Sequence, residues 1–155
     1  MFNIVLFEPE IPPNTGNIMR LCANSGAKLH LIEPLGFKIT QKEMRRAGLD
    51  YISEKNYTIY KNFDLFMNNI SSTSKLYGIS TKAKNNYVSV EFNKDDYFIF
   101  GPETRGLPES IRMSIGQENL LRIPMLAESR SINLANSVSI ILYEAWRQNN
   151  FKNGS

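Results

Sequence analysis

The side chains that most often bind metals or perform acid–base catalysis are scarce in this sequence. It contains one histidine, His30, and one cysteine, Cys22, whereas a typical zinc site needs three or four His, Cys or carboxylate ligands at short spacings. His30 stands in the alternating segment KLHLIE, which favours a structural histidine in a strand over a ligand or a base. A serine–histidine–aspartate triad would depend on this same histidine, and no GxSxG segment accompanies it. The residue types therefore argue against a bound metal and against triad hydrolysis.

The glycines and prolines of the sequence do not form a standard nucleotide-binding loop. The first apolar segment is followed by EPEIPPNTGN rather than by GxGxxG, and the P-loop pattern is missing. Gly101, Pro102 and Gly106 allow the main chain to turn sharply and approach a ligand closely, although an ordinary turn is the favoured explanation for each taken singly. No standard phosphate-binding loop is therefore indicated.

Cationic side chains permit binding to a polyanion without requiring it. The formal net charge is +3 and the pI is about 9.0, values that many unrelated proteins share. Arg45 and Arg46 are adjacent, and Lys82 and Lys84 lie close together. Further arginines punctuate the second half of the chain, namely Arg105, Arg112, Arg122 and Arg130. Each of these could equally be a solvated surface charge.

Apolar segments of strand type alternate with segments of helical periodicity. Strands are expected at residues 3–7, 28–33, 57–60, 75–79, 97–100 and 120–123. Helices are expected at residues 14–25, 40–47, 63–70 and 133–147, and another is expected to open at Pro108. Residues 82–96 are polar and predict a loop, either near a functional face or simply at the surface. The alternation predicts an α/β fold with a mostly parallel sheet flanked by helices.

Length and composition fit one globular domain over residues 1–155, with a polar tail at about 150–155 that is expected to fray. Apolar residue types make up 42% and charged types 21%, as in proteins with a real core. No apolar run is long enough to span a bilayer, and the first residues are unlike a targeting segment. We therefore expect a cytoplasmic protein with no membrane partner.

Three separated segments resemble the SpoU branch of the SPOUT RNA methyltransferases. They are NTGNIMR at residues 14–20, FGPETRGLP at 100–108, and IPM at 123–125 together with SRSINLAN at 129–136. They occur in order and span almost the whole chain. Together with RRAGLDY and SINLANSVSIILYEAWRQ, they are most similar to the small single-domain members that methylate the wobble ribose of tRNA.

The resemblance implies an α/β-knot fold in which a C-terminal trefoil knot builds an S-adenosylmethionine pocket, without a metal. Transferred residue by residue, the cofactor site comprises Ile79, Gly101, Glu103, Ile123 and Ser131. Leu121, Met125 and Leu134 would help to line the pocket, although plain core packing is as good an explanation for each.

The resemblance also assigns the catalytic role to Arg20. A guanidinium hardly ever loses its proton, so we expect Arg20 to stabilise the developing alkoxide of a ribose 2′-hydroxyl and to hold a neighbouring phosphate. Asn17 would orient Arg20 or the ribose, or else cap a helix. Glu103 would pair with Arg20, or else be an acid at a helix N-terminus.

The implied substrate is cytidine or uridine 34 in the anticodon loop of tRNA, with leucine isoacceptors the expected tRNAs and no role for DNA. Candidate RNA contacts are Arg45, Arg46, Lys82, Arg105 and Tyr143. The family is dimeric, so we expect a homodimer formed through the first and last helices; a last helix buried within the monomer is the competing interpretation. Methylation of another tRNA or a ribosomal site, or a catalytically silent RNA-binding module, are the alternative functions.

Overall fold

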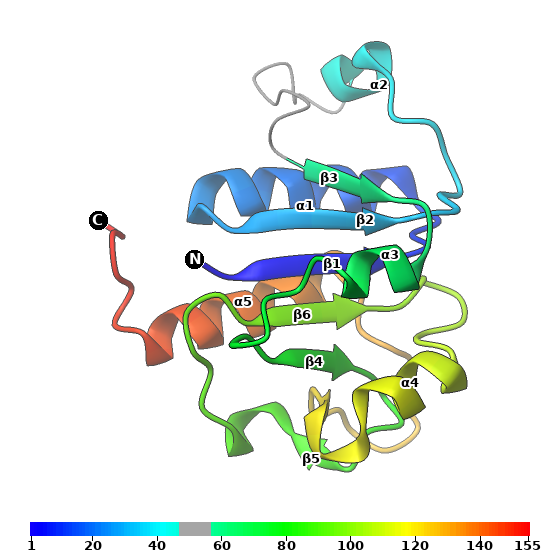
Figure 1. The fold of residues 1–155 in the computed structure, drawn as a ribbon. Coiled ribbons are helices and arrows are strands. Elements are labelled where there is room, and N and C mark those ends of the chain that lie inside the picture. The colour runs from blue at the N-terminus through cyan, green and yellow to red at the C-terminus, as the bar shows by residue number, and fades with distance from the viewer. Residues whose placement is uncertain (47–56) are drawn as a thin grey trace.

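The computed structural model describes residues 1–46 and 57–155, and its centre is a parallel sheet (Figure 1). The strands are β1 (Asn3–Phe7), β2 (Lys28–Ile32), β3 (Tyr57–Tyr60), β4 (Leu76–Ile79), β5 (Asn85–Asn86), β6 (Tyr97–Phe100) and β7 (Leu120–Arg122). They lie in the order β3-β2-β1-β6-β4-β7-β5, and all six pairings of neighbouring strands are parallel. The predicted α/β fold with a parallel sheet is confirmed.

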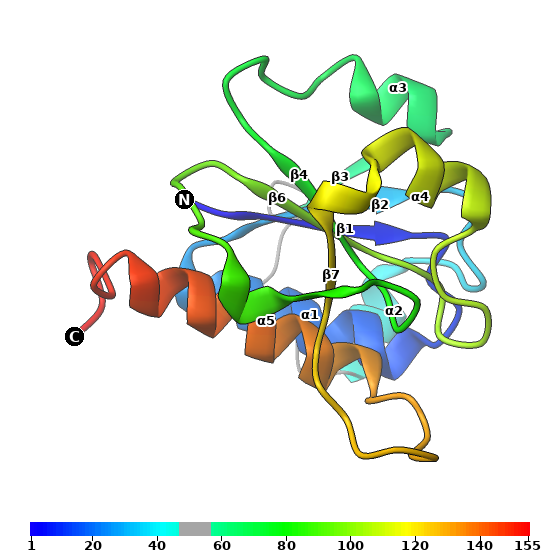
Figure 2. The same ribbon diagram turned by 90° about the horizontal axis from the view of Figure 1, so that it is seen from below.

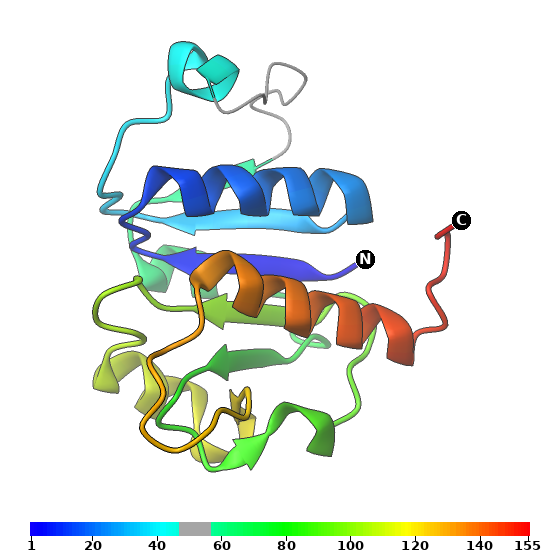
Figure 3. The same cartoon turned by 180° about the vertical axis from the view of Figure 1, so that it is seen from behind.

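Helices cover both faces of the sheet (Figures 2 and 3). They are α1 (Pro12–Ser25), α2 (Gln41–Arg46), α3 (Phe63–Met67), α4 (Glu109–Ile115) and α5 (Leu134–Gln148). Because side chains alternate along a strand, Ile4 and Leu6 of β1 pack in the core beneath α1 and α5, whereas Val5 and Phe7 pack on the side of α3 and α4. The near-continuous apolar strands of the sequence reflect this burial on both faces.

Helix α1 starts two residues earlier than predicted, at Pro12 rather than at residue 14. Proline is tolerated in the first turn because the N–H groups there have no partner within the helix, and Pro12 and Pro13 occupy the first two positions. Gly26 ends the helix with a φ of 71°, a left-handed conformation that glycine adopts without steric cost.

Three other elements differ from expectation. Helix α3 ends at Met67 rather than at residue 70. Just after this end, the Asn69 side chain donates a hydrogen bond to the main-chain carbonyl of Leu65 at 2.7 Å. The predicted loop at residues 82–96 contains the short strand β5, which pairs with β7, and a single 3-10 turn at Tyr87–Ser89. Helix α2 covers residues 41–46 of the predicted helix at 40–47, and Ala47 lies outside the described residues.

Helix α5 has the predicted apolar face, since Val138, Ile141 and Ala145 are fully buried. The chain then turns at its end, where Trp146 Nε1 donates to the carbonyl of Lys152 at 3.1 Å and the rings of Trp146 and Phe151 meet edge to face. None of the described helices is both long and apolar enough to cross a membrane.

Candidate functional site

The main candidate site is a cavity of about 370 Å³ at the carboxyl ends of β4, β6 and β7. Ligands of open α/β sheets usually bind at this edge. Its walls come from the segments that follow these three strands and from the first turns of α1 and α5. The lining residues are Ile11, Asn14, Ile79–Lys82, Phe100–Leu107, Ile123, Met125, Ser131–Leu134 and Ser137.

One wall is the rim loop, residues 101–107, whose two ends lie almost against each other. A Cβ on Gly101 would lie 2.2 Å from the carbonyl carbon of Gly106 and from the amide nitrogen of Leu107, so only glycine fits there. The Gly106 amide also donates to the carbonyl of Pro102 at 2.8 Å, and Gly106 has a φ of 67°. The requirement for glycine at position 101 is therefore a close approach of main chain to main chain.

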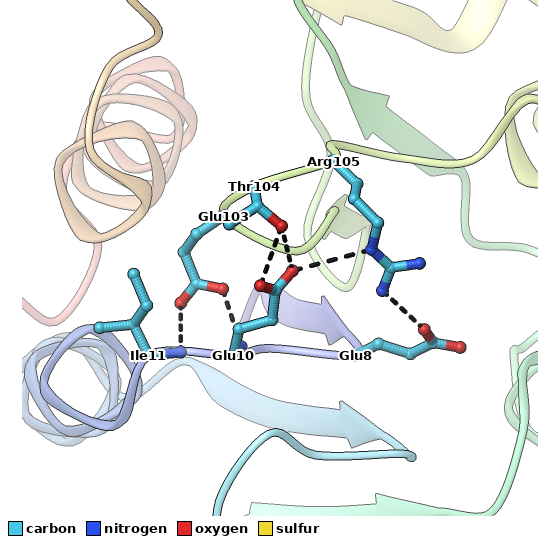
Figure 4. Close-up of polar contacts among 6 residues, drawn as sticks. All are labelled: Glu8, Glu10, Ile11, Glu103, Thr104 and Arg105. Atoms are coloured by element: carbon cyan, nitrogen blue, oxygen red, sulfur yellow. Dashed lines mark hydrogen bonds and ion pairs between the residues drawn. The ribbon is translucent and has the colours of Figure 1, made fainter.

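Glu103 binds the main chain at the start of α1 (Figure 4). Its carboxylate accepts hydrogen bonds from the amides of Glu10 at 2.8 Å and Ile11 at 3.0 Å. Ile11 is the N-cap residue of α1 and supplies no side-chain cap, so the carboxylate places negative charge at the positive end of the helix dipole. The predicted pairing with Arg20 is not among the contacts of Glu103. Glu103 is closer to the alternative prediction of an acid at a helix N-terminus, but the helix is α1 and not α4, which follows Glu103 in the chain.

Side chains also reach in the opposite direction, from β1–α1 to the rim loop (Figure 4). The Thr104 hydroxyl lies 2.8 and 2.9 Å from the two carboxylate oxygens of Glu10 and donates its proton to them. Arg105 Nη2 donates to Glu8 at 3.0 Å, and Arg105 Nε lies 3.8 Å from Glu10. The Arg105 side chain remains 58% exposed, so these ion pairs are screened by water.

Asn14 and Asn133 extend the contacts of the rim loop to α5. Asn14 Nδ2 donates to Glu103 at 3.3 Å, and Asn133 Nδ2 donates to Asn14 Oδ1 at 3.0 Å. The side-chain oxygen Oδ1 of Asn133 accepts from the main-chain amides of Ala135 and Asn136 and so caps α5. Hydrogen bonds thus join the rim loop, α1 and α5 around the cavity.

Most of the predicted cofactor residues meet at this cavity. Those that line it are Ile79, Gly101, Glu103, Ile123, Met125, Ser131 and Leu134. Leu121 differs from them, because it is fully buried in the core beneath α1 and α5 and does not line the cavity. Core packing, the alternative prediction, describes Leu121.

The predicted catalytic residues of α1 lie apart from the cavity wall. Arg20 and Asn17 are both exposed, three residues apart on the helix. Asn17 lines a second, largely apolar cavity of about 420 Å³ between α1 and the segment that leads to α2. The alternative role of Asn17 as a helix cap is wrong, because α1 already begins at Pro12.

The predicted RNA contacts are dispersed over the surface. Lys82 and Arg105 line the main cavity, whereas Arg45 and Arg46 lie exposed on α2, with Arg46 at the second cavity. Tyr143 is 46% exposed on α5, where its ring meets that of Trp146 edge to face.

The sequence predicts no role at this cavity for Thr104 or for Asn133. Asn133 could have been found as a cap, because asparagine directly before an apolar helical run is a helix-start signal. No local signal marks Thr104, whose partner Glu10 is 94 residues away in the chain.

The single histidine and the single cysteine of the chain are both structural. His30 is buried between Asn3 and Tyr60, which lie 3.1 and 3.2 Å from its ring nitrogens. Burial, with a smaller effect of Lys28, lowers the pKa of His30 to about 4, and burial raises the pKa of the Cys22 thiol to about 12. Within residues 1–46 and 57–155, no group of three or more His, Cys, Asp or Glu could hold a metal ion.

Comparisons with known proteins agree with the predicted family. The model of the SpoU rRNA Methylase family matches residues 1–143. The chain is 54% identical over 151 residues to the tRNA (cytidine(34)-2′-O)-methyltransferase of Saccharophagus degradans, covering 97% of each chain. It is 51% identical over 148 residues to the protein of the same name from Escherichia coli K12, covering 96% of this chain and 94% of that one.

Solved structures show the same fold. One, described as giving structural insights into the 2-OH methylation of C/U34 on tRNA, matches with a TM-score of 0.89 at 38% identity, over 97% of each chain. The SpoU methyltransferase AviRb from Streptomyces viridochromogenes, in complex with AdoMet, matches with a TM-score of 0.81 at 23% identity, over 96% of this chain and 57% of that one.

Proposed function

Because the chain belongs to the SpoU rRNA methylase family, we propose that it is an S-adenosylmethionine-dependent methyltransferase that acts on the 2′-hydroxyl of cytidine or uridine 34 of tRNA. The observation that carries the proposal is the meeting of three separated segments, around Ile79, Gly101 and Ile123, at one cavity. Relatives that match nearly the full length of the chain at 44–54% identity share this named activity.

The cavity fits the methyl donor. Its volume of about 370 Å³ lies within the range of small-molecule sites. Ile79, Ile123 and Leu134 offer apolar surface to a flat ring, and the rim loop offers main-chain polar groups. When bound, S-adenosylmethionine supplies an activated methyl group, so the protein's own task is to orient the ribose and stabilise charge.

Arg20 is proposed to stabilise the alkoxide that develops on the ribose and to hold a phosphate that takes the proton. Its guanidinium keeps its charge in this role. Arg20 lies six residues beyond Asn14, a rise of about 9 Å along α1, and Asn14 lines the cavity. The RNA therefore has to extend from the exposed side of α1 to the cavity mouth.

The proposal includes a tRNA anticodon loop held mainly through its phosphates, with leucine isoacceptors as substrates and the cytoplasm as location. Arg45, Arg46, Lys82, Arg105 and Tyr143 are the proposed contacts. It also includes a homodimer, since α1 and α5 lie side by side on one face (Figure 3) and Tyr143 is exposed there. The C-terminal trefoil knot is part of the same proposal.

The test is methyl transfer from radiolabelled S-adenosylmethionine to bulk tRNA and to ribosomal RNA, followed by mapping of the modified nucleotide. We expect label at nucleotide 34, no label on a tRNA carrying 2′-deoxycytidine there, and a large loss of rate in Arg20→Lys, which lacks the planar fork. Label in ribosomal RNA alone would contradict the substrate. Absence of label in every RNA would favour a silent RNA-binding module.

A further inference from the structure

The rim loop and the connection between β1 and α1 are joined by hydrogen bonds that run in both directions (Figure 4). From the rim loop, the Glu103 carboxylate binds the main-chain amides of Glu10 and Ile11. From the connection, the Glu10 carboxylate binds the Thr104 hydroxyl through both of its oxygens, at 2.8 and 2.9 Å. We call the Thr104–Glu10 contact the rim clasp.

The rim clasp acts at the start of a helix that has no side-chain cap of its own. Pro12 and Pro13 have no N–H to offer, and the N-cap residue Ile11 makes no side-chain cap. The position of the first turn of α1 relative to the rim loop is therefore set largely by the side chains of Glu103 and Glu10. A charged acceptor strengthens each of these hydrogen bonds.

These two segments carry the two parts of the proposed reaction. The rim loop lines the cavity proposed for the methyl donor, and α1 carries Arg20. In-line methyl transfer is sensitive to small displacements, since a shift of about 1 Å can cost about 100-fold in rate. A contact that fixes the rim loop against the start of α1 therefore fixes the position of the methyl donor relative to the Arg20 guanidinium, which stabilises the alkoxide.

We propose that Thr104 and Glu10 are positioning residues for methyl transfer, which act by holding the cofactor loop against the catalytic helix. The inference rests on the proposed function. Neither residue needs to touch the RNA or the reacting methyl group. Because Glu103, Gly101 and the bond from the Gly106 amide to Pro102 keep the rim loop folded, losing the clasp should alter alignment more than cofactor binding.

The decisive variant is Thr104→Val, which keeps the side-chain shape and removes the donor. We expect kcat for methylation of nucleotide 34 to fall about tenfold, with the Kd for S-adenosylmethionine and the KM for tRNA changed less than about threefold. Thr104→Ser keeps a hydroxyl and should restore most of kcat. Thr73→Val is the matched control, because it removes another exposed threonine hydroxyl away from the cavity and should leave kcat unchanged.

A double-mutant cycle separates positioning from general loosening. Glu10→Ala removes the contact with Thr104 and also the ion pair with Arg105, so it should lower kcat at least as far as Thr104→Val. The double variant should be no slower than Glu10→Ala, because that single variant already removes the clasp. If the losses of kcat in the two single variants multiply in the double variant, or if Thr104→Val keeps the wild-type kcat, the proposed role of the rim clasp is overturned. The proposed function stays intact in both cases. Absence of transfer by the wild-type protein would overturn both, and calorimetric titration with S-adenosylmethionine reports binding independently of that result.

Discussion

Replacing Gly101 by alanine should damage the cofactor cavity through a main-chain clash. The added Cβ would lie 2.2 Å from the carbonyl carbon of Gly106 and from the amide nitrogen of Leu107, and 2.6 Å from the carbonyl oxygen of Gly106. Contacts shorter than 3.4 Å are already rare for Cβ atoms, so the two ends of the rim loop would have to separate by about 1.2 Å, the difference between 3.4 and 2.2 Å. Both neighbours are main chain and cannot rotate away as a side chain would.

The loss of cofactor affinity in Gly101→Ala depends on how much of the strain has to be overcome when the cofactor binds. Overpacking of this kind costs about 1–3 kcal/mol. If about 2 kcal/mol of it has to be overcome to restore the binding geometry, affinity for S-adenosylmethionine falls about 30-fold. Calorimetric titration of wild type and Gly101→Ala measures this loss directly, and thermal unfolding of the same samples shows whether the variant is folded.

Gly106→Ala is the matched control in the same loop. No atom lies within 4 Å of a Cβ there, but the φ of 67° is unfavourable for alanine, at a cost of about 1–2 kcal/mol. We expect a lower melting temperature with affinity changed less than about threefold, because no main chain has to separate. Wild-type affinity in Gly101→Ala, or an equal loss in both variants, would refute the clash argument.

Three further outcomes follow from burial and charge. The folded-state pKa of His30 is about 4, below the unfolded value of about 6.5, so the neutral form stabilises the fold above pH 6.5 and this stability is lost as pH falls toward 4. In urea unfolding, the free energy of unfolding of the wild type should fall by about 2 kcal/mol more than that of His30→Leu between pH 7 and pH 5. Equal decreases in the two proteins would contradict this. Thr15 Oγ1 is buried and has no hydrogen-bond partner within residues 1–46 and 57–155, so Thr15→Val should raise the free energy of unfolding by about 1 kcal/mol or leave it unchanged. A decrease larger than that in urea titrations would argue for a further partner. If Arg45 and Arg46 bind phosphates, the double alanine variant should raise the KM for tRNA and reduce the salt slope of binding by about 1 per lost contact, whereas an unchanged slope would remove α2 from the RNA surface.

The central strands of the sheet were predictable because they are buried on both faces. Residues 4–7 and 98–100 are apolar throughout, and both strands lie where the sequence predicts them. Strand β5 gave no such signal, since Asn85 and Asn86 join the sheet through main-chain pairing with β7 alone. Helix α1 starts earlier than predicted because Pro12 and Pro13, which would break a helix further along, are accommodated in its first turn.

The site was predictable only in part, and the reason is topological. The resemblance assigns Ile79 and residues of the second and third motifs to one pocket, and the structure brings them together at one edge of the sheet. The partners of Glu103 were not predictable, because nothing in the local sequence states that β6 lies beside β1. Once that neighbour is known, the loops that follow two parallel strands must meet at the same edge.

The same topology explains why the acidic residues after β1 matter to a chain with a net positive charge. Glu8 and Glu10 follow β1, and Arg105 follows β6. Because these two strands pair, both carboxylates lie beside the guanidinium of Arg105, which lines the cavity. A phosphate that approaches Arg105 must therefore compete with two carboxylates or use the guanidinium N–H groups that point elsewhere. Removing Glu8 alone should strengthen RNA binding at Arg105 without disturbing the contact between Thr104 and Glu10. Weaker RNA binding by Glu8→Gln, measured by filter binding at fixed salt, would instead mean that the carboxylate orients the guanidinium for the phosphate.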